Sequence, residues 1–401
     1  MSKKFRIGLL GKLIIGIVLG IMLGLWAPTQ FNRVVVTAST LFSAFLKFVI
    51  PLLIVAFVTI GIADLSEGAG KLLLISTCIS YLSSLLWGII AFTVSGTVFP
   101  RFVPEVAVAG ISNPDSGMLK PFFTIPLPPV MDVTSALVLA FILGLCLSSM
   151  RKETVSLYGP LKDFSHVINS VLKRAVIPFL PLYICGIFVN MTVSGQTFMI
   201  LGILWKVFLT VIILHVICLL TMYFIAGGIS HKSPFRLLKN QVPGYISAMG
   251  TQSSAATIPV NLRCAEADGV SPEIRNFVIP LCANIHMAGS MITITCCVTA
   301  VQLLYNMPSN LGMMAPFIMT LGIAMVASPG APGGSIMTAL PFLPIVGIAS
   351  DSAIAGLLIA LYITQDSFGT ACNVSGDNSI SVIVDTIYRK FLKNDIRTEA
   401  V

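Results

Sequence analysis

Long apolar runs separated by short polar stretches make up the first 230 residues of the chain. An apolar run of about 20 residues can cross the hydrocarbon core of a membrane as a helix. The first run is too long for the hydrophobic region of a signal peptide, and further spans follow it, so we interpret it as a retained helix. The pattern predicts spans at residues 8–28, 34–62, 71–98, 131–149, 164–190 and 197–228.

After residue 230, polar clusters interrupt the hydrophobic pattern twice. Segments 240–263 and 312–348 are too polar in their middles to cross lipid. Non-helical backbone at membrane depth is tolerated only where protein buries it or where it lines a cavity, so both segments predict re-entrant hairpins. Each is followed by a span, at 274–304 and 351–388, and the chain ends in a tail at 389–401. The expected fold is an all-α polytopic membrane protein with eight transmembrane helices plus two re-entrant helical hairpins.

Composition and charge placement agree with a membrane protein. Charged residues make up only 10% of the 401 residues, against about 25% in soluble domains. The net charge of +8 comes from basic residues at helix ends, as in RKETVSLYGPLK after the fourth span and HKSPFRLLK after the sixth. This positive-inside pattern predicts that both termini are cytoplasmic, and it gives no reason to expect nucleic-acid binding. The nine cysteines lie mostly in apolar runs without a CxxC motif, so we expect packing roles and neither disulfides nor metal sites.

The last span carries four polar residues at spacings of 4, 3 and 4, namely Asp366, Thr370, Asn373 and Asp377. This spacing places them on one helical face. An ionisable residue inside a span is expected to be functional, although a buried polar stripe that only joins helices is the alternative. Because no basic residue lies in the helix interior, the two carboxylates predict cations supplied from solution.

Three further segments carry candidate chemistry. The first hairpin tip, residues 252–256, should break one helix and restart another near Thr257–Pro259, offering free N–H groups to a carboxylate. A plain serine-containing turn is the alternative. The second tip, 328–335, is rich in glycine and proline, so it offers bare carbonyls to a cation and could act as a lid. His286 interrupts a helix among small residues, where it either packs or carries a proton.

Taken together, these motifs resemble the dicarboxylate/amino acid:cation symporters, the bacterial relatives of glutamate transporters. The segments SSAATIPVN (253–261), IPLCANIHMAGSMITIT (279–295) and QDSFGTACN (365–373) look most like the serine/threonine:sodium symporter branch. The resemblance implies a homotrimer in which residues 1–70 and 131–195 form a scaffold. It implies a moving transport unit made of residues 71–98 and 196–230, both hairpins and the last two spans.

The resemblance also implies roles for individual residues. Asp366 would bind a substrate ammonium group, and Asn373 with the backbone of Gln252 and Ser254 would bind its carboxylate. The remaining substrate-binding positions implied are Ser253, Gly330, Gly333 and Thr370. One sodium ion would bind Asp377 and Asn373 with carbonyls of Cys282 and His286. Carbonyls near Ser328 and of Asn284 would hold a second, and Ser83 and Ser84 would contribute to a third.

Departures from the family pattern narrow the expected function. Carriers of acidic substrates place an arginine where this chain has Gly369 or Gln252, so a second substrate carboxylate would be buried unpaired. The asparagine and aspartate of the family's NMDGT motif are His286 and Ala288 here. Sodium prefers oxygen ligands, so we expect the third sodium site to be missing and proton coupling through His286 to be an open alternative.

We therefore expect sodium-coupled uptake of a small neutral amino acid such as serine, threonine or alanine, by alternating access in a bacterial inner membrane. The coupling ion is the only cofactor expected. The closest alternative is a proton-coupled carrier of the same fold for a neutral amino acid or another small metabolite. An intramembrane hydrolase using Ser253 or Ser254 with His286 and Asp377, and a passive channel, are the alternatives from other classes.

Overall fold

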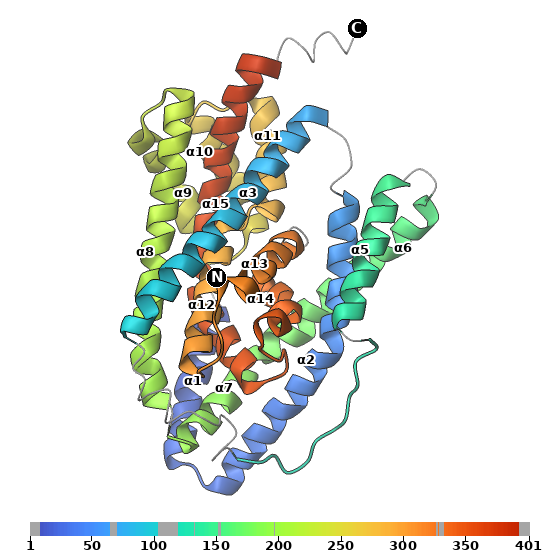
Figure 1. Ribbon diagram of the computed structural model, residues 1–401, viewed down its shortest axis with the longest axis vertical. Helices are drawn as coiled ribbons and strands as arrows, with labels where there is room; N and C mark the ends of the chain where they lie inside the picture. The colour runs from blue at the N-terminus through green and yellow to red at the C-terminus, as the bar shows by residue number, and fades with distance from the viewer. Residues whose placement is uncertain are drawn as a thin grey trace, which may run out of the picture.

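The computed structural model describes residues 9–64, 70–102, 119–131, 133–150, 154–195, 197–325, 328 and 333–392. Within these ranges the chain forms helices and connecting turns and contains no strand (Figure 1). By length and composition, six helical segments among the described residues could cross a membrane: Thr29–Phe57, Leu72–Arg101, Ser156–Val193, Leu201–Ser230, Pro272–Leu304 and Ala353–Lys390.

The first half of the chain forms helices close to the predicted spans. They are α1 (Leu9–Trp26), α2 (Thr29–Asp64), α3 (Gly70–Val98), α5 (Val133–Ser149), α6 (Val155–Val171), α7 (Ile177–Val193) and α8 (Thr197–Ser230). The fifth predicted span begins too late, because its first turns carry Lys162 and Asp163 on an amphipathic helix that an apolar-run criterion overlooks. A π-helical turn at Leu172–Val176 joins α6 to α7.

Helices α1, α2, α5, α6 and α7 pack mainly on one another. Glycines at every fourth position of α1 allow its close approach to α7. A Cβ added at Gly16 or Gly20 would lie 2.6 Å from the backbone oxygen of Pro181 or Cys185, respectively. Such small-residue stripes are typical of helix contacts within membranes.

In the segment of the first predicted hairpin the chain forms two packed helices, α9 (Pro234–Thr251) and α10 (Ser254–Ala267). Together they are longer than the predicted 240–263. The second helix also restarts earlier than predicted, at Ser254, because the Ser253 side chain caps it by accepting from the N–H of Ala256 at 3.3 Å. Gln252 makes the turn with a left-handed φ of +52°.

The seventh predicted span is broken into α11 (Pro272–Ile285) and α12 (Ala288–Leu304). The second hairpin comprises α13 (Leu311–Met325), α14 (Gly334–Ala339) and a 3₁₀ segment at Leu340–Val346 that packs back on α13. The last helix, α15, runs unbroken over Ala353–Ile387 and continues as a π-helical turn, Tyr388–Leu392, into the predicted tail. The rest of that tail, 393–401, lies outside the described residues.

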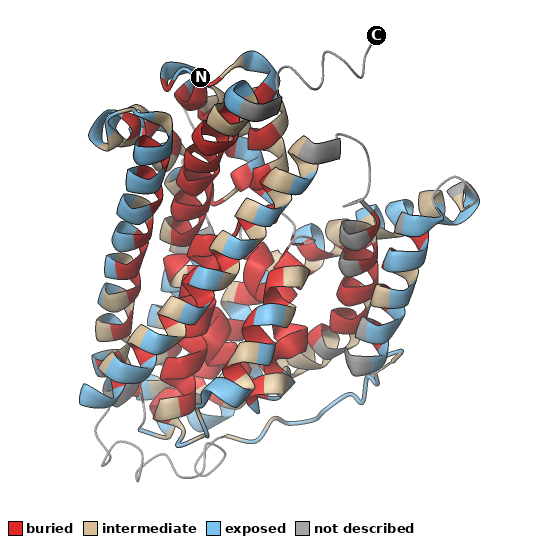
Figure 2. Ribbon diagram, turned by 45° about the horizontal axis from the view of Figure 1, so that its top comes forward, coloured by how far each residue is buried: buried red, intermediate tan, exposed pale blue. Residues whose placement is uncertain are grey.

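Helix α15 lies at the centre of the second half of the molecule. It packs against α8, α9, α11 and α12, and nearly all of its residues are buried (Figure 2). By contrast, α8 and α9 are exposed along their outer sides (Figure 2). The polar face of α15 is therefore enclosed by the two hairpins and the broken helix α11–α12.

Candidate functional site

All four residues of the predicted stripe lie on α15 and are buried: Asp366, Thr370, Asn373 and Asp377. Among the residues whose burial the structure describes, no lysine or arginine is buried. Buried carboxylates therefore lie in a region without permanent positive charge. Ionised carboxylates in such surroundings need a cation or several hydrogen bonds.

Asp366 connects α15 to the second hairpin. Its Oδ2 accepts a hydrogen bond from the N–H of Gly333 at 2.8 Å, and its Oδ1 accepts one from the Tyr362 hydroxyl at 2.9 Å. Thr370 lies one turn further on, with its hydroxyl 3.4 Å from the same Oδ1. Gly333 adopts a φ of +73°, which favours glycine at this tip. Gly330, the other glycine expected at the tip, lies outside the described residues.

Asn373 caps the second half of the broken helix. Its side-chain oxygen accepts from the N–H groups of Gly289 at 2.8 Å and Ser290 at 3.2 Å, in the first turn of α12. Its Nδ2 donates to the Ser290 hydroxyl at 3.0 Å and lies 3.4 Å from the Met287 sulfur. The Asn373 carboxamide was expected to bind substrate and sodium. In this conformation its hydrogen bonds are instead made to the residues that start α12.

Ser290 connects two residues of the stripe, Asp366 and Asn373, and sequence reasoning missed it. Its hydroxyl accepts from Asn373, and it lies 3.2 Å from the hydroxyls of both Tyr362 and Ser335. Tyr362 in turn donates to Asp366. A buried chain of polar groups thus links Asp366 to Asn373 through α15 and α12. The only signal in the sequence was the place of Ser290 directly after the helix break.

The first hairpin tip meets α15 beside Asp366. The Nε2 of Gln252 donates to the Ser367 hydroxyl at 2.7 Å, and the Gln252 side chain is buried. Its backbone N–H donates to Ala248 O at 2.8 Å, which closes α9. Ser254 is the buried first residue of α10, where helical N–H groups have no partner within the helix. The tip therefore presents N–H groups from Ser254 rather than from Gln252.

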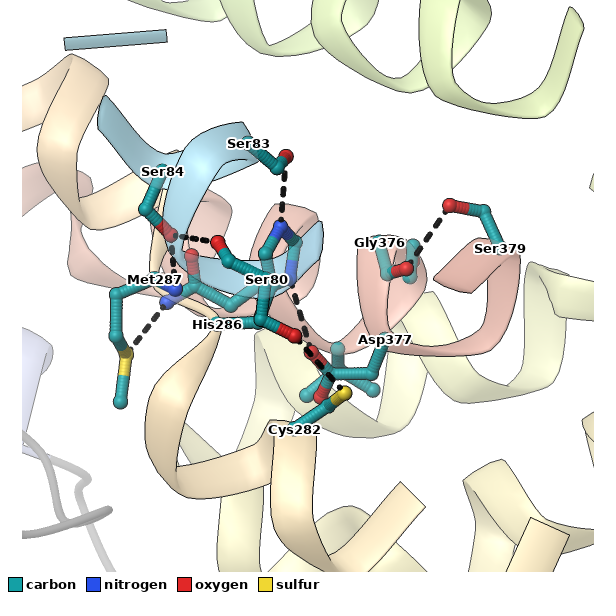
Figure 3. Close-up of polar contacts among 12 residues, drawn as sticks. Ser80, Ser83, Ser84, Cys282, His286, Met287, Gly376, Asp377 and Ser379 are labelled. Carbon is teal, nitrogen blue, oxygen red and sulfur yellow. Dashed lines mark hydrogen bonds and ion pairs between the residues drawn. The ribbon is translucent and has the colours of Figure 1, made fainter. Parts of the chain in front are cut away.

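His286 lies in the break between α11 and α12, in direct contact with the stripe (Figure 3). Its Nδ1 is 3.0 Å from Asp377 Oδ1, and its Nε2 is 3.2 Å from the Ser83 hydroxyl of α3. Both His286 and Asp377 are almost completely buried. The second carboxylate oxygen of Asp377, Oδ2, has no hydrogen-bond partner among the described residues. The imidazole thus occupies one side of the carboxylate and leaves the other available to a cation.

Helix α3 supports the same break through neighbouring hydroxyls (Figure 3). Ser84 accepts from the N–H of Met287 at 3.0 Å, and Ser80 lies 3.3 Å from the sulfur of Cys282. The backbone oxygen of Cys282 accepts the last helical bond of α11, from the N–H of His286. Ser83 and Ser84, which were expected to serve a third sodium site, therefore hold His286 and Met287 in place.

Only part of the expected second sodium site, with carbonyls of Asn284 and near Ser328, lies within the described residues. The Asn284 side chain is exposed and donates to Pro280 O of its own helix at 2.9 Å. Ser328 is buried, but residues 326–327 and 329–332 around it lie outside the described ranges. The described residues also contain no cluster of three histidine, cysteine or acidic side chains that would bind a transition metal.

His215 on α8 is a second histidine near the stripe, at a position that no sequence motif marks. Its Nε2 lies 3.0 Å from Gly289 O and 3.1 Å from the Thr293 hydroxyl. Gly289 is the residue whose N–H is capped by Asn373. His215 therefore supports the first turn of α12 from α8.

Gly376 lets α15 approach the imidazole of His286. A Cβ at this position would overlap the ring at Cε1 and lie 3.1 Å from both Nδ1 and the Met222 methyl group. We expect Gly376→Ala to lower the free energy of unfolding by about 1–3 kcal/mol, because it overpacks a filled core. Thermal unfolding in detergent measures the change.

Gly228→Ala on α8 is the matched control, because a Cβ there meets no atom within 4 Å. We expect the control to be neutral or slightly stabilising, since alanine favours helix over glycine. Equal melting temperatures for the two variants would show that the contact between α15 and His286 is not tight.

The fold and the site together define the class of protein. Polar residues buried on a central helix, faced by a broken helix and two hairpin tips, are the arrangement by which membrane transporters hold small solutes at mid-depth. Both ring nitrogens of His286 have partners outside the first hairpin tip, Nδ1 with Asp377 and Nε2 with the Ser83 hydroxyl, whereas the hydrolase alternative required Ser253 or Ser254. The molecule is an integral membrane transport protein of the secondary type.

The chain belongs to the Sodium:dicarboxylate symporter family, which it matches over residues 9–387. Among curated proteins, "Serine/threonine transporter SstT" of Acinetobacter baumannii strain AYE is 29% identical over 399 residues, covering 95% of this chain and 97% of the relative. The protein of the same name from strain SDF is 28% identical over 398 residues, with the same coverage. The family resemblance expected from the hairpin and stripe motifs is confirmed.

Proposed function

We propose that this protein takes up a small neutral amino acid, such as serine, threonine or alanine, by symport with sodium. The observation that carries the proposal is the buried Asp366 carboxylate between the two hairpin tips, in surroundings without a buried lysine or arginine. Such a site attracts an ammonium group and penalises an additional negative charge. The names of the two A. baumannii relatives, both serine/threonine transporters, support the same substrate class.

In the proposed complex the ammonium group of the substrate binds Asp366 and its carboxylate faces the first turn of α10. The ammonium would replace the Gly333 N–H as a partner of Asp366, and so would loosen or reposition the second hairpin tip. The substrate carboxylate would accept hydrogen bonds from the start of α10 at Ser254, where the helix dipole favours an anion. Thr370 would line the ammonium end of the site, because its hydroxyl lies 3.4 Å from Asp366 Oδ1.

The proposed sodium ion binds at Asp377, on the side of the carboxylate that His286 leaves available. Oδ2 of Asp377 is the buried oxygen without a partner that supports this position. The Asn373 oxygen would join it only if the cap on α12 rearranged, since that oxygen already accepts two hydrogen bonds. Ion binding at Asp377 would therefore be coupled to the helix break next to the substrate site.

Proton coupling is the second candidate, and the contact between His286 and Asp377 favours it. In either charge state of the imidazole, Nδ1–H can donate to Asp377. The Ser83 hydroxyl can donate to a neutral Nε2 or accept from a protonated one by rotating. The pair can thus take up one proton without losing a hydrogen bond.

The proposed transport cycle uses the two packing groups of the fold. Helices α1, α2, α5, α6 and α7 would form the scaffold, assembled as a homotrimer, with both termini in the cytoplasm. Helices α3 and α8 to α15 would move as the transport unit and expose the site alternately to each side. The packing of α1, α2, α5, α6 and α7 mainly on one another supports this division.

Substrate charge is expected to depend on position 252. Gln252 is buried and contacts Ser367, the neighbour of Asp366 on α15. We expect Gln252→Arg to make aspartate a measurable competitor of serine uptake, because a guanidinium there can pair with a second carboxylate. The measurement is uptake of labelled serine into proteoliposomes against a panel of unlabelled amino acids and succinate.

Gly369→Arg is the matched control, at the other position where acidic-substrate carriers have arginine. A Cβ at 369 would lie 3.4 Å from the Thr293 hydroxyl and 3.6 Å from the Gly289 backbone. The arginine would therefore be forced between α12 and α15, and we expect loss of transport without gain of aspartate binding. Uptake of aspartate or succinate by the native protein at the level of serine would contradict the proposed substrate class.

A further inference from the structure

A pocket of about 490 Å³ lies where α8 turns into α9, at the end of the molecule where α15 also ends (Figure 1). Its lining comes from the α8–α9 corner, the turn between α10 and α11, and the end of α15. It is separate from the substrate and ion sites described above. The corner sequence HKSPFRLLK is one of the basic segments that the charge pattern places in the cytoplasm.

Three permanent positive charges line this pocket, from Lys232, Arg236 and Arg389. The Lys232 ammonium donates to the backbone oxygen of Asp268 at 2.5 Å and forms no close ion pair with a carboxylate among the described residues. Arg389 pairs with Asp385 at 2.8 Å and also donates to Gly269 O. Arg236 is exposed and has no hydrogen bond or ion pair among the described residues.

The one acidic side chain of the lining faces other groups. Asp268 accepts from the amide of Asn240 through Oδ1 and from the amide of Asn378 through Oδ2, both at 2.8 Å. Burial raises the pKa of this carboxyl, while the two amides and the nearby Lys232 and Arg236 lower it. Helix α9 also begins at the pocket, and the Ser233 side chain does not cap its first N–H groups. The pocket is therefore suited to an anion.

An apolar surface adjoins the pocket on its outer side. Phe235, the third residue after Lys232, is 68% exposed and packs edge-on against Phe224 of α8, with ring centroids 5.5 Å apart. Ile225 and Ile229 continue this surface along α8 and are also exposed. A soluble anion would leave this apolar surface exposed, whereas the acyl chains of a lipid would cover it.

We propose that the pocket binds the phosphate headgroup of an anionic phospholipid of the cytoplasmic leaflet, with its acyl chains along Phe224, Phe235 and Ile229. Arg236 contributes the free guanidinium, Lys232 the second cation, and the start of α9 the N–H groups. Because the pocket joins the first hairpin to the end of α15, the bound lipid holds the base of that hairpin against the central helix.

The test is native mass spectrometry of the purified full-length protein, titrated with phosphatidylglycerol and, separately, with phosphatidylcholine. The native protein is expected to retain phosphatidylglycerol in preference. Arg236→Gln is expected to weaken that binding about fivefold, as is typical for one basic residue at an anionic lipid surface. Lys239→Gln removes an exposed charge from the same helix outside the pocket lining and is expected to leave the affinity unchanged.

Three results would overturn the proposal. The first is equal retention of the two lipids, and the second is an equal loss of affinity in the Arg236→Gln and Lys239→Gln variants. The third is displacement of phosphatidylglycerol by an equal concentration of glycerol phosphate, which would assign the pocket to a soluble anion. Binding is measured without substrate or ion gradient, so the outcome is independent of the proposed transport function.

Discussion

Replacing Asp366 by asparagine is expected to reduce amino-acid uptake at least about 30-fold, as loss of a buried charged partner does elsewhere. The carboxylate accepts from Gly333 on one oxygen and from Tyr362 and Thr370 on the other. An asparagine would turn an NH₂ group toward one of these donors, so it would lose both the ammonium partner and a contact to the second hairpin. Initial uptake of labelled serine into proteoliposomes measures the effect.

Asp385→Asn is the control for this prediction, because Asp385 lies on the same helix but pairs with Ser271 and Arg389 at its far end. We expect that variant to be inserted and to transport serine. Normal uptake by Asp366→Asn would refute the assignment of the ammonium site and favour a substrate without an amino group.

Uptake by the native protein is expected to fall at least about tenfold when the medium is made acidic, because a proton taken up by the His286–Asp377 pair would compete with the proposed sodium ion. Acid would add a positive charge to His286, 3.0 Å from the carboxylate that the proposed sodium ion uses. The other titratable groups around the pair are Cys282 of α11 and Tyr223 of α8, and neither gains positive charge with acid. His286→Asn should therefore flatten the pH profile and raise the apparent affinity for sodium.

The same experiment with sodium replaced by choline separates the two coupling candidates. Uptake that persists in choline and increases with acid would exclude sodium coupling and assign the coupled proton to His286. An unchanged pH profile in His286→Asn would show that the histidine only packs in the break.

The sequence alone predicted the features that depend on local periodicity. The spacing of Asp366, Thr370, Asn373 and Asp377 placed them on one face of one helix, and the structure has them buried together on α15. The interruptions at 252–256 and at His286 also correspond to real breaks between helices. The spacing of hydrophobic and polar residues predicts these features, because residues three or four positions apart lie on the same face of a helix.

Contacts between distant segments could not be predicted in this way. Ser290, Tyr362 and His215 join the site only because α12, α15 and α8 pack together. The sequence likewise did not show that Asn373 caps α12, or that Ser83 faces His286 from a helix about 200 residues earlier. Two predicted helix ends differ from the observed ones. The start of α10 is set by the capping side chain of Ser253, and the start of α6 was missed because charged residues on its polar face interrupt the apolar run.

The most direct test of the account is accumulation of labelled serine in proteoliposomes under an imposed inward sodium gradient at fixed pH. The serine concentration inside the proteoliposomes is expected to rise above the external concentration. This accumulation is expected to disappear when a sodium ionophore dissipates the gradient. Equilibration of serine without accumulation, or accumulation of succinate in its place, would contradict the account.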